Sequence, residues 1–297
     1  MKIKNAYIKE FKIPFKKDIL GQGKYKEGLY FICETDDNKT GIGELSAYFG
    51  LHSYHSMDLK NQLDELAKRF KNVTLNLEQF DPHRPLFNVL NIAGIDTRLL
   101  FCVESALLDL IGKNSYFNNH SPKIQALIIP NAPLPTVVGD IVKVKIGKID
   151  IQDEINLLKE LPCKLRLDSN STLKPEIIRR YWSSLGDKID FFEDPFEFSP
   201  KWKDLALEGI PLALDEDLAK YLNEDLSFLK NIIIKPNLFE GIHSTLKIID
   251  DSEIPVIISS TFESKIGINT LKKITQYKGI KTNTAHGLGT LSYLENH

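Results

Sequence analysis

The first 50 residues alternate apolar and polar side chains in short runs. The runs LYFICE and GIGELS are typical of strands with one buried face, and the segments GQGKYKEG and DDNKTG between such runs are turn-like. This pattern predicts a small antiparallel sheet at the start of the chain.

Two helical stretches are expected after this sheet. In the first, apolar residues recur at steps of four, three and four, which predicts a single apolar stripe. The residues of this stripe are Leu59, Leu63, Leu66 and Phe70. The second stretch, residues 97–111, is apolar almost all round, so we expect it to be buried between layers.

From residue 124 onward, brief β-like runs alternate with amphipathic stretches. The eight candidate strands are ALII, VKVKI, KLRLD, DFFED, PLALD, NIIIKP, PVIISS and KTNTAHG. Regular alternation of strand and helix favours a parallel sheet, and this number of units at this spacing favours a closed barrel. An open, doubly wound sheet is the alternative.

The composition is that of a folded globular protein. Of 297 residues, 42% are hydrophobic, and the 38 basic residues are spread along the chain against 40 acidic ones, so nucleic acid is not an expected partner. Three widely spaced cysteines argue against a disulfide framework and indicate a reducing, cytoplasmic compartment. Neither export nor membrane insertion is expected, because no stretch reaches about 18 apolar residues.

Charged residues stand in the candidate strands where a buried strand should be apolar. The set is Lys143 and Lys145, then Asp168, Glu193, Asp215 and Lys235. From Lys145 onward the separations are 23, 25, 22 and 20 residues, about one β/α unit each, so every unit presents its charge at the same level. The aliphatic neighbours occupy the other face of each strand, which predicts that the charges point into a barrel near the carboxyl ends of its strands.

Three carboxylates in one interior need a compensating charge, because burying an unpaired charge is very costly. A bound divalent cation supplies it. Oxygen ligands without His or Cys suit Mg²⁺, for which Mn²⁺ can substitute, and disfavour zinc.

The segments KVK, LRLDSN, FFEDPF, ALDED and IIIKPN, in this order, resemble the metal and lysine motifs of the enolase superfamily. GIGELSAYFG and VIISSTFESKIGI resemble the short-chain branch of the o-succinylbenzoate synthases within it. The resemblance covers the whole chain. It implies a modified TIM-type (β/α)7β barrel in residues 101–290 and an N-terminal α+β capping domain in residues 1–100, completed by C-terminal residues.

The resemblance also implies a role for individual residues. The metal ligands would be Asp168, Glu193 and Asp215. The catalytic lysines would be Lys145 and Lys235, on opposite sides of the substrate, with Lys143 beside them. Substrate contacts and supports would come from Arg166, Asn170, Ser259, Ser260 and Gly287. Loops near residues 21–28 and 47–52 would close over the barrel mouth.

The implied activity is a hydro-lyase reaction of menaquinone biosynthesis, the dehydration of 2-succinyl-6-hydroxy-2,4-cyclohexadiene-1-carboxylate to 2-succinylbenzoate. Lys145 would remove the proton next to the carboxylate, giving an enediolate that the metal and a cationic Lys235 stabilise. A base lysine needs a lowered pKa, and we expect Lys143 to lower the pKa of Lys145 by like-charge repulsion and desolvation.

Other activities are compatible with the same constellation. An N-acylamino acid racemase or a dipeptide epimerase would use the same two lysines, although TNTAHGLGT lacks the Asp-x-Asp usual near the eighth strand of dipeptide epimerases. A mandelate-type or sugar-acid dehydratase needs a late His base, and PVIISSTFESK has none. A non-catalytic barrel usually loses one of the charged positions, and all are present here. The substrate is expected to be a small carboxylate, and the protein a monomer or weak homo-oligomer.

Several further polar residues have plainer interpretations. Glu44 is expected in a solvated turn, and Glu263 and Ser264 are expected to support the loop after the seventh barrel strand. The histidines expected in surface or loop positions are His52, His55, His243 and His286.

Overall fold

The protein's structure, a computed structural model, describes most of the chain. The described residues are 1–16, 23–46, 56–76, 81, 84, 95–112, 115–129, 139–281 and 285–295. Of the two loops expected to close over the barrel mouth, residues 21, 22 and 47–52 lie outside this set.

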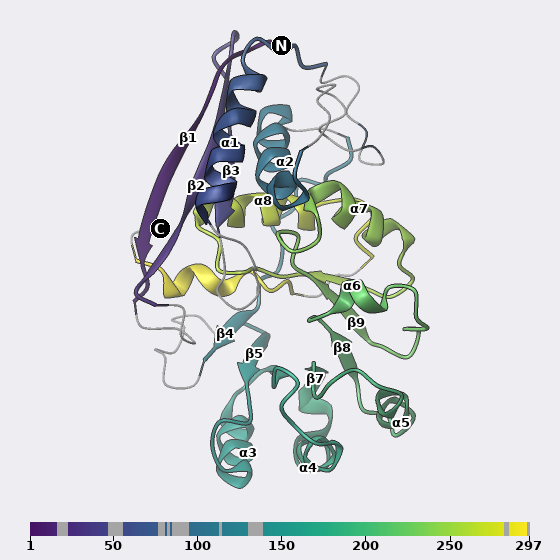
Figure 1. Cartoon of the computed structure of the whole chain (residues 1–297). Coiled ribbons are helices and arrows are strands. Elements are labelled where there is room, and N and C mark those ends of the chain that lie inside the picture. Colours follow the sequence, from purple (N-terminus) through teal and green to yellow (C-terminus); the bar gives the residue numbers. More distant parts are fainter. Residues whose placement is uncertain are drawn as a thin grey trace.

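An antiparallel sheet forms the N-terminal layer, as the alternating pattern predicts (Figure 1). Its strands, in spatial order, are β1 (Ile3–Pro14), β2 (Tyr25–Thr35) and β3 (Thr40–Ser46). Helix α1 (Ser56–Phe70) packs on β1 and β2. Its predicted apolar stripe is confirmed, because Leu59, Leu63, Leu66 and Phe70 are all buried.

Helix α2 (Thr97–Ile111) lies between this sheet and the helices of the barrel, which confirms that it is buried between layers (Figure 1). Two glycines of β3 face it at close range. A Cβ atom on Gly43 would lie 1.7 Å from the carbonyl oxygen of Cys102, and one on Gly41 would lie 2.2 Å from that of Ala106. The GIGELS segment therefore needs glycine at both positions so that strand and helix backbones can meet.

A curled parallel sheet forms the second layer, with its strands in sequence order. The described strands are β4 (Ala126–Ile128), β5 (Ile141–Lys145), β6 (Lys164–Asp168), β7 (Ile189–Glu193), β8 (Leu212–Leu214), β9 (Asn231–Ile234) and β10 (Val256–Ile258). The helices between and after them are α3 (Ile151–Glu160), α4 (Pro175–Leu185), α5 (Lys201–Leu207), α6 (Leu218–Tyr221), α7 (Gly241–Asp251) and α8 (Lys265–Thr275), with short 3₁₀ helices η3 (Gly186–Lys188) and η4 (Gly289–Tyr293).

The eighth predicted strand joins the two ends of this sheet. His286 forms a parallel bridge with Ile124, next to β4, and Gly287 forms one with Ser259, next to β10. Only these two bridges represent the KTNTAHG strand in the described residues, since 282–284 lie outside them. The predicted barrel fold with its antiparallel cap is confirmed, and the doubly wound alternative is wrong.

The barrel interior is layered as strand alternation predicts. Towards the amino ends of the strands, the inward side chains form a small apolar cluster of Phe191, Ala213, Ile233 and Ile257. Two residues further along the same strands come Glu193, Asp215, Lys235 and Ser259. The apolar floor therefore lies beneath a polar layer at the carboxyl ends, where barrel enzymes carry their active sites.

The C-terminal residues run back to the cap. Phe15 forms an antiparallel bridge with Leu294, and the Glu295 N–H donates to the carbonyl oxygen of Pro14 at 2.9 Å. The predicted domain boundary between residues 100 and 101 falls within α2 and stays a prediction.

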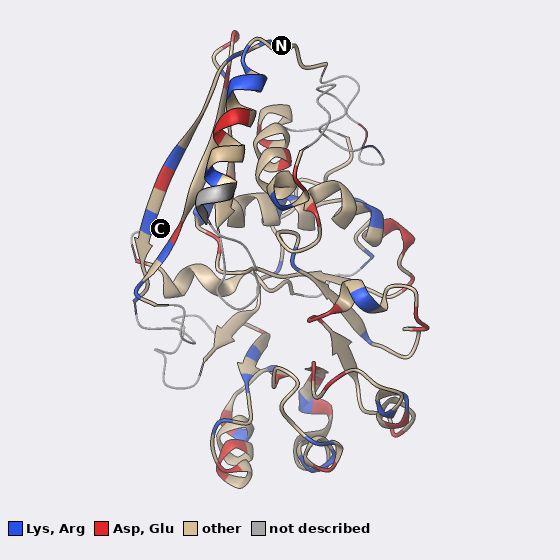
Figure 2. Ribbon diagram, viewed as in Figure 1, with Lys and Arg blue, Asp and Glu red and all other residues tan. Residues whose placement is uncertain are grey.

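Charged residues of both signs are interspersed along the cap strands and the barrel helices, as the balanced composition suggests (Figure 2). Within the described ranges, none of the helices is both long enough and apolar enough to cross a bilayer.

Candidate active site

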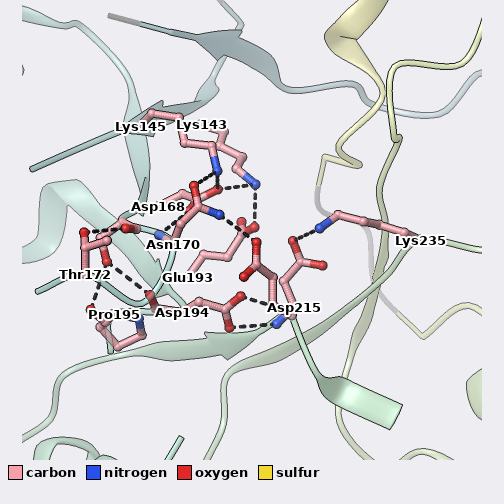
Figure 3. Close-up of polar contacts among 12 residues, drawn as sticks. Lys143, Lys145, Asp168, Asn170, Thr172, Glu193, Asp194, Pro195, Asp215 and Lys235 are labelled. Atoms are coloured by element: carbon pink, nitrogen blue, oxygen red, sulfur yellow. Dashed lines mark hydrogen bonds and ion pairs between the residues drawn. The ribbon is translucent and has the colours of Figure 1, made fainter. Parts of the chain in front are cut away.

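Three carboxylates meet at the carboxyl ends of neighbouring barrel strands (Figure 3). Asp168 ends β6, Glu193 ends β7, and Asp215 directly follows β8. Strand register places Asp168 beside Glu193. All three are buried, with exposed fractions of 1%, 1% and 6%. The spacing of about one β/α unit between these acids in the sequence therefore does bring them together in space.

Lysines contact these acids from two sides (Figure 3). Lys143 Nζ lies 2.7 Å from Asp168 Oδ2 and also donates to Glu193. Lys145 Nζ lies 2.6 Å from the same Asp168 oxygen. Lys235 approaches from the other side of the acids and lies 2.5 Å from Asp215 Oδ2. The site thus holds two lysines of β5 facing a third lysine at the end of β9.

The charges of the lysines are strongly compensated. Burial favours the neutral amine of Lys143, but the attraction of the surrounding acids, chiefly Asp168 and Glu193, raises its pKa well above the ordinary value. Burial likewise opposes the charge of Lys235, and Asp215 raises the pKa of that lysine. One oxygen of Asp168 contacts the ammonium groups of both Lys143 and Lys145.

The acids divide into two groups. Burial raises the pKa of Glu193 well above its ordinary value, and the charges of Asp168 and Asp215 add to the rise. Burial and the charge of Asp215 raise the pKa of Asp194 to about 8. For Asp168 and Asp215 the attraction of the lysines outweighs burial, so the pKa of each is lowered. The site therefore favours the ionised forms of Asp168 and Asp215 and disfavours those of Glu193 and Asp194.

The donor atoms fit a hard divalent cation, because the three converging side chains offer only carboxylate oxygens. A bound cation would favour the ionised forms of Glu193 and Asp194. Among the described residues, no three His, Cys, Asp or Glu side chains are arranged to hold a metal ion as they stand. Here the ammonium groups of Lys143 and Lys235 contact the carboxylates instead.

Two acids that sequence reasoning missed support this arrangement. Asp194, with a φ of 41°, accepts hydrogen bonds from the backbone N–H groups of Asp215 at 3.0 Å and Glu216 at 2.7 Å. Glu216 accepts from the side-chain amide of Asn170 at 2.7 Å. Asn170 in turn accepts from Lys145, so its orientation is set from both ends. The available signal was position, because Asp194 and Glu216 each directly follow a predicted ligand.

Arg166 lies one layer below the acids. It is fully buried, and its guanidinium donates to Asp190 at 2.8 Å and to the carbonyl oxygen of Ala285 at 2.6 Å. It also donates to Gln125 and stacks over Phe191, 4.8 Å from the ring centroid. These contacts connect β6 with β7, with Gln125 just before β4 and with Ala285 near the C-terminus. A role for Arg166 in substrate binding stays a prediction.

The other predicted substrate contacts lie beside Lys235. The Ser260 N–H donates to the carbonyl oxygen of Gly287 at 3.1 Å, and the Ser260 hydroxyl hydrogen-bonds with that of Thr290 at 2.7 Å. A Cβ atom on Gly287 would lie 2.6 Å from the Ser259 hydroxyl oxygen, so glycine is required for this approach. The structure thus brings Ser259, Ser260 and Gly287 together, and their contact with a substrate stays a prediction.

Two predictions about polar residues are wrong. His286 is buried, and its Nδ1 accepts a hydrogen bond from the Ile258 N–H at 3.1 Å. Glu44 is 1% exposed and accepts from the backbone N–H groups of Ser264 and Gly267, at 3.0 Å each, at the start of α8. Local sequence pattern does not reveal partners in such distant segments.

The support expected from Glu263 is confirmed, because its carboxylate accepts from the N–H of Thr261 at 2.7 Å and from the Thr261 hydroxyl. Ser264 caps α8 by accepting from the Ile266 N–H at 3.2 Å. Both residues shape the loop that follows β10.

No family model and no curated protein matches the chain. Among solved structures, the dipeptide epimerase of Enterococcus faecalis V583 aligns with a TM-score of 0.74 at 19% identity, over 100% of this chain and 92% of that one. The L-Ala-D/L-Glu epimerase of Bacillus subtilis gives 0.72 at 17% identity, over 100% and 92%. The muconate lactonizing enzyme of Pseudomonas putida gives 0.71 at 16% identity, over 100% and 90%.

These structural neighbours are enzymes of the enolase superfamily, and one structure of the E. faecalis epimerase contains Mg and the dipeptide L-Leu-L-Tyr. At identities below one in five, the likeness concerns the fold. The chain therefore has the enolase-superfamily fold, an antiparallel cap over a curled parallel barrel sheet.

Proposed function

We propose that this protein is an Mg²⁺-dependent enzyme that removes a proton from the carbon next to a carboxylate. More specifically, we propose an o-succinylbenzoate synthase, which dehydrates 2-succinyl-6-hydroxy-2,4-cyclohexadiene-1-carboxylate to 2-succinylbenzoate. The observation that carries the proposal is the approach of Lys145 and Lys235 to one group of buried acids from opposite sides (Figure 3).

In this proposal Asp168, Glu193 and Asp215 hold the cation. Their buried, all-oxygen donor set supports this assignment. When bound, Mg²⁺ stabilises the negative charge that spreads onto the substrate carboxylate as the neighbouring carbon loses its proton.

Lys145 is the proposed base. Asp168 and Asn170 contact its amine and so fix the direction from which it meets the substrate. The carbon–hydrogen bond breaks as the proton moves to the Lys145 nitrogen, and the electron pair left on carbon forms the new ring double bond as the carbon–oxygen bond breaks. The same proton then leaves with the hydroxide as water, so one lysine acts as base and then as acid.

Lys235 stays cationic in this reaction. Burial opposes its charge, and the contact with Asp215 raises its pKa. It lies on the side of the acids away from Lys145 and is placed to stabilise developing negative charge from the opposite face of the substrate ring.

The second candidate is an N-acylamino acid racemase or dipeptide epimerase. The two epimerases of the same fold and the paired lysines favour it. Such a reaction needs each lysine in turn as base and as acid, so Lys235 would have to lose its proton. The segment TNTAHGLGT lacks the Asp-x-Asp usual near the eighth strand of dipeptide epimerases, which favours the dehydratase, in which Lys235 remains charged.

The test is a direct comparison on the purified protein. Dehydration is followed by ultraviolet absorbance of the aromatic product, and racemisation of N-succinyl amino acids or epimerisation of L-Ala-L-Glu by optical rotation. Each assay is run with Mg²⁺, with a chelator, and after Mg²⁺ is restored. We expect dehydration to be faster and to require Mg²⁺. Faster racemisation or epimerisation would select the second candidate, and no metal-dependent reaction in any assay would refute both.

A further inference from the structure

A buried lysine of the cap reaches the barrel beside the proposed active site. Lys26 lies near the start of β2 and is 3% exposed. Its ammonium donates a hydrogen bond to the carbonyl oxygen of Thr261 at 3.1 Å. Burial of this ammonium group lowers its pKa, and the nearby charges of Glu263 and Glu44 offset part of that effect. A lysine of the cap thus contacts one peptide group of the loop after β10, the one between Thr261 and Phe262.

This peptide group is held in a costly conformation. Phe262, which follows Thr261, has a φ of 62°, in the left-handed region that bulky residues rarely adopt. The Phe262 N–H donates to the Ser260 hydroxyl oxygen at 2.9 Å, and Glu263 holds the N–H of Thr261. Such a conformation persists only where the surroundings enforce it. The contact from Lys26 is one of those constraints.

The same loop borders the proposed catalytic lysine on both sides. The Ser259 N–H donates at 2.8 Å to the carbonyl oxygen of Ile234, directly before Lys235. Two residues after Lys235, the Asn237 side-chain amide donates to the Thr261 hydroxyl oxygen at 3.3 Å. The Ile234 backbone before Lys235 and the Asn237 side chain after it are therefore hydrogen-bonded to the segment that Lys26 contacts.

The cap has a separate attachment to the barrel. Glu44 accepts from Ser264 and Gly267 at the start of α8, and the Tyr30 hydroxyl donates to the Ser264 hydroxyl oxygen at 3.0 Å. The Asn237 amide also donates to the carbonyl oxygen of Ser46 at 3.2 Å. Because these bonds do not involve the Lys26 ammonium, its contact with the loop can be removed while they remain.

We propose that Lys26 is a positioning residue for Lys235. It holds the peptide between Thr261 and Phe262, and this loop is bonded to the Ile234 backbone before the catalytic lysine and to the Asn237 side chain after it. The position of the cap on the barrel thereby affects the position of Lys235. The inference rests on the proposed function of Lys235.

The experiment compares Lys26→Met, which removes the charge, with Lys26→Arg, which keeps it. Lys12→Met is the matched control, because Lys12 is an exposed cap lysine paired with Glu27 at 2.6 Å. Each protein is assayed for dehydration and examined by amide hydrogen exchange well below its unfolding temperature.

For Lys26→Met we expect kcat to fall roughly 10- to 100-fold, as misplacement of a catalytic group does. Exchange should accelerate in residues 259–264 and stay unchanged in β6 and β7. Lys26→Arg should restore most of kcat, and Lys12→Met should match the unmodified protein.

Unchanged kcat and unchanged exchange in Lys26→Met would overturn the proposal, as would exchange that accelerates uniformly over the barrel, which indicates a loss of stability only. If the unmodified protein has no activity, the proposed function fails. Exchange in residues 259–264 then decides alone whether Lys26 holds the loop. If Lys26→Met does not fold, Asn237→Ala replaces it, and wild-type kcat in that variant would overturn the proposal.

Discussion

Contacts with neighbouring side chains hold the amine of Lys145, the proposed base, in one position. Its amine meets Asp168 on one side and the amide oxygen of Asn170 on the other, and Glu216 fixes that amide. The long lysine side chain therefore loses rotational freedom before substrate binds, which reduces the cost of reaching the reactive geometry.

We expect Lys145→Ala to lower kcat by roughly 10²- to 10⁴-fold, the usual contribution of a general base. The fold should be unaffected, because the substitution removes only one side chain at the end of β5. The matched control is Lys148→Ala, an exposed lysine in the following loop. Far-ultraviolet circular dichroism checks the fold of both. Substantial activity in Lys145→Ala would rule out its role as base.

His286 should make stability depend on pH. Burial, with smaller effects from Arg166 and His120, lowers its pKa to about 4 from an ordinary value of 6.5. The folded protein keeps this imidazole neutral while the unfolded chain takes up a proton, so its contribution is complete above the ordinary pKa and is lost as the pH falls towards 4. At about pH 5.5 the loss is ~1 kcal/mol.

Urea unfolding at about pH 7.5 and about pH 5.5 measures this loss. His286→Asn keeps an acceptor for the Ile258 N–H and removes the titration. We expect the free energy of unfolding to fall by ~1 kcal/mol more in the unmodified protein than in the variant. Equal falls in both would show that His286 does not titrate in this range.

The sequence predicted which residues point into the barrel where a regular strand pattern specifies the face of each residue. Asp168, Glu193 and Asp215 were found because each interrupts an apolar run at a regular interval. Asp194 and Glu216 were missed because their roles depend on hydrogen bonds between neighbouring units. A one-dimensional pattern reports which face a residue occupies and does not report its partner in the next strand.

At the scale of elements, the contact between β3 and α2 joins the cap sheet to the rest of the chain. Glycines at 41 and 43 let the strand backbone lie against the helix backbone. The sequence predicted both elements, since the periods of two and 3.6 residues are local. It did not predict their contact, because nothing in either period specifies the partner surface.

We expect Gly43→Ala to destabilise the protein by about 1–3 kcal/mol, because the new methyl group would push β3 away from the Cys102 carbonyl. Gly139→Ala is the control, since its Cβ atom would lie 3.8 Å from the nearest atom, an ordinary contact. That change should stay within about 0.5 kcal/mol. Chemical denaturation gives both values, and equal stability of the two variants would contradict the packing argument.

For the molecule as a whole, the sequence predicted the barrel with its cap because the β/α rhythm and the charged positions agree with each other. The contact of Glu44 with the barrel was not predicted. Glu44 was expected in a solvated turn, yet it binds the start of α8, 220 residues away in the chain. Long-range contacts of this kind leave no local periodicity.

If one site, between two lysines and three acids, removes a carbon-bound proton with the help of Mg²⁺, loss of that proton must depend on both the metal and Lys145. Proton NMR in D₂O follows the loss in two ways: as conversion of 2-succinyl-6-hydroxy-2,4-cyclohexadiene-1-carboxylate to 2-succinylbenzoate, and as exchange of the proton next to the carboxylate in N-succinyl amino acids. We expect proton loss from at least one of these carboxylates with Mg²⁺, none with a chelator, recovery when Mg²⁺ returns, and none in Lys145→Ala. Proton loss that persists in the chelator, or none with Mg²⁺ from either carboxylate, would contradict this chemistry.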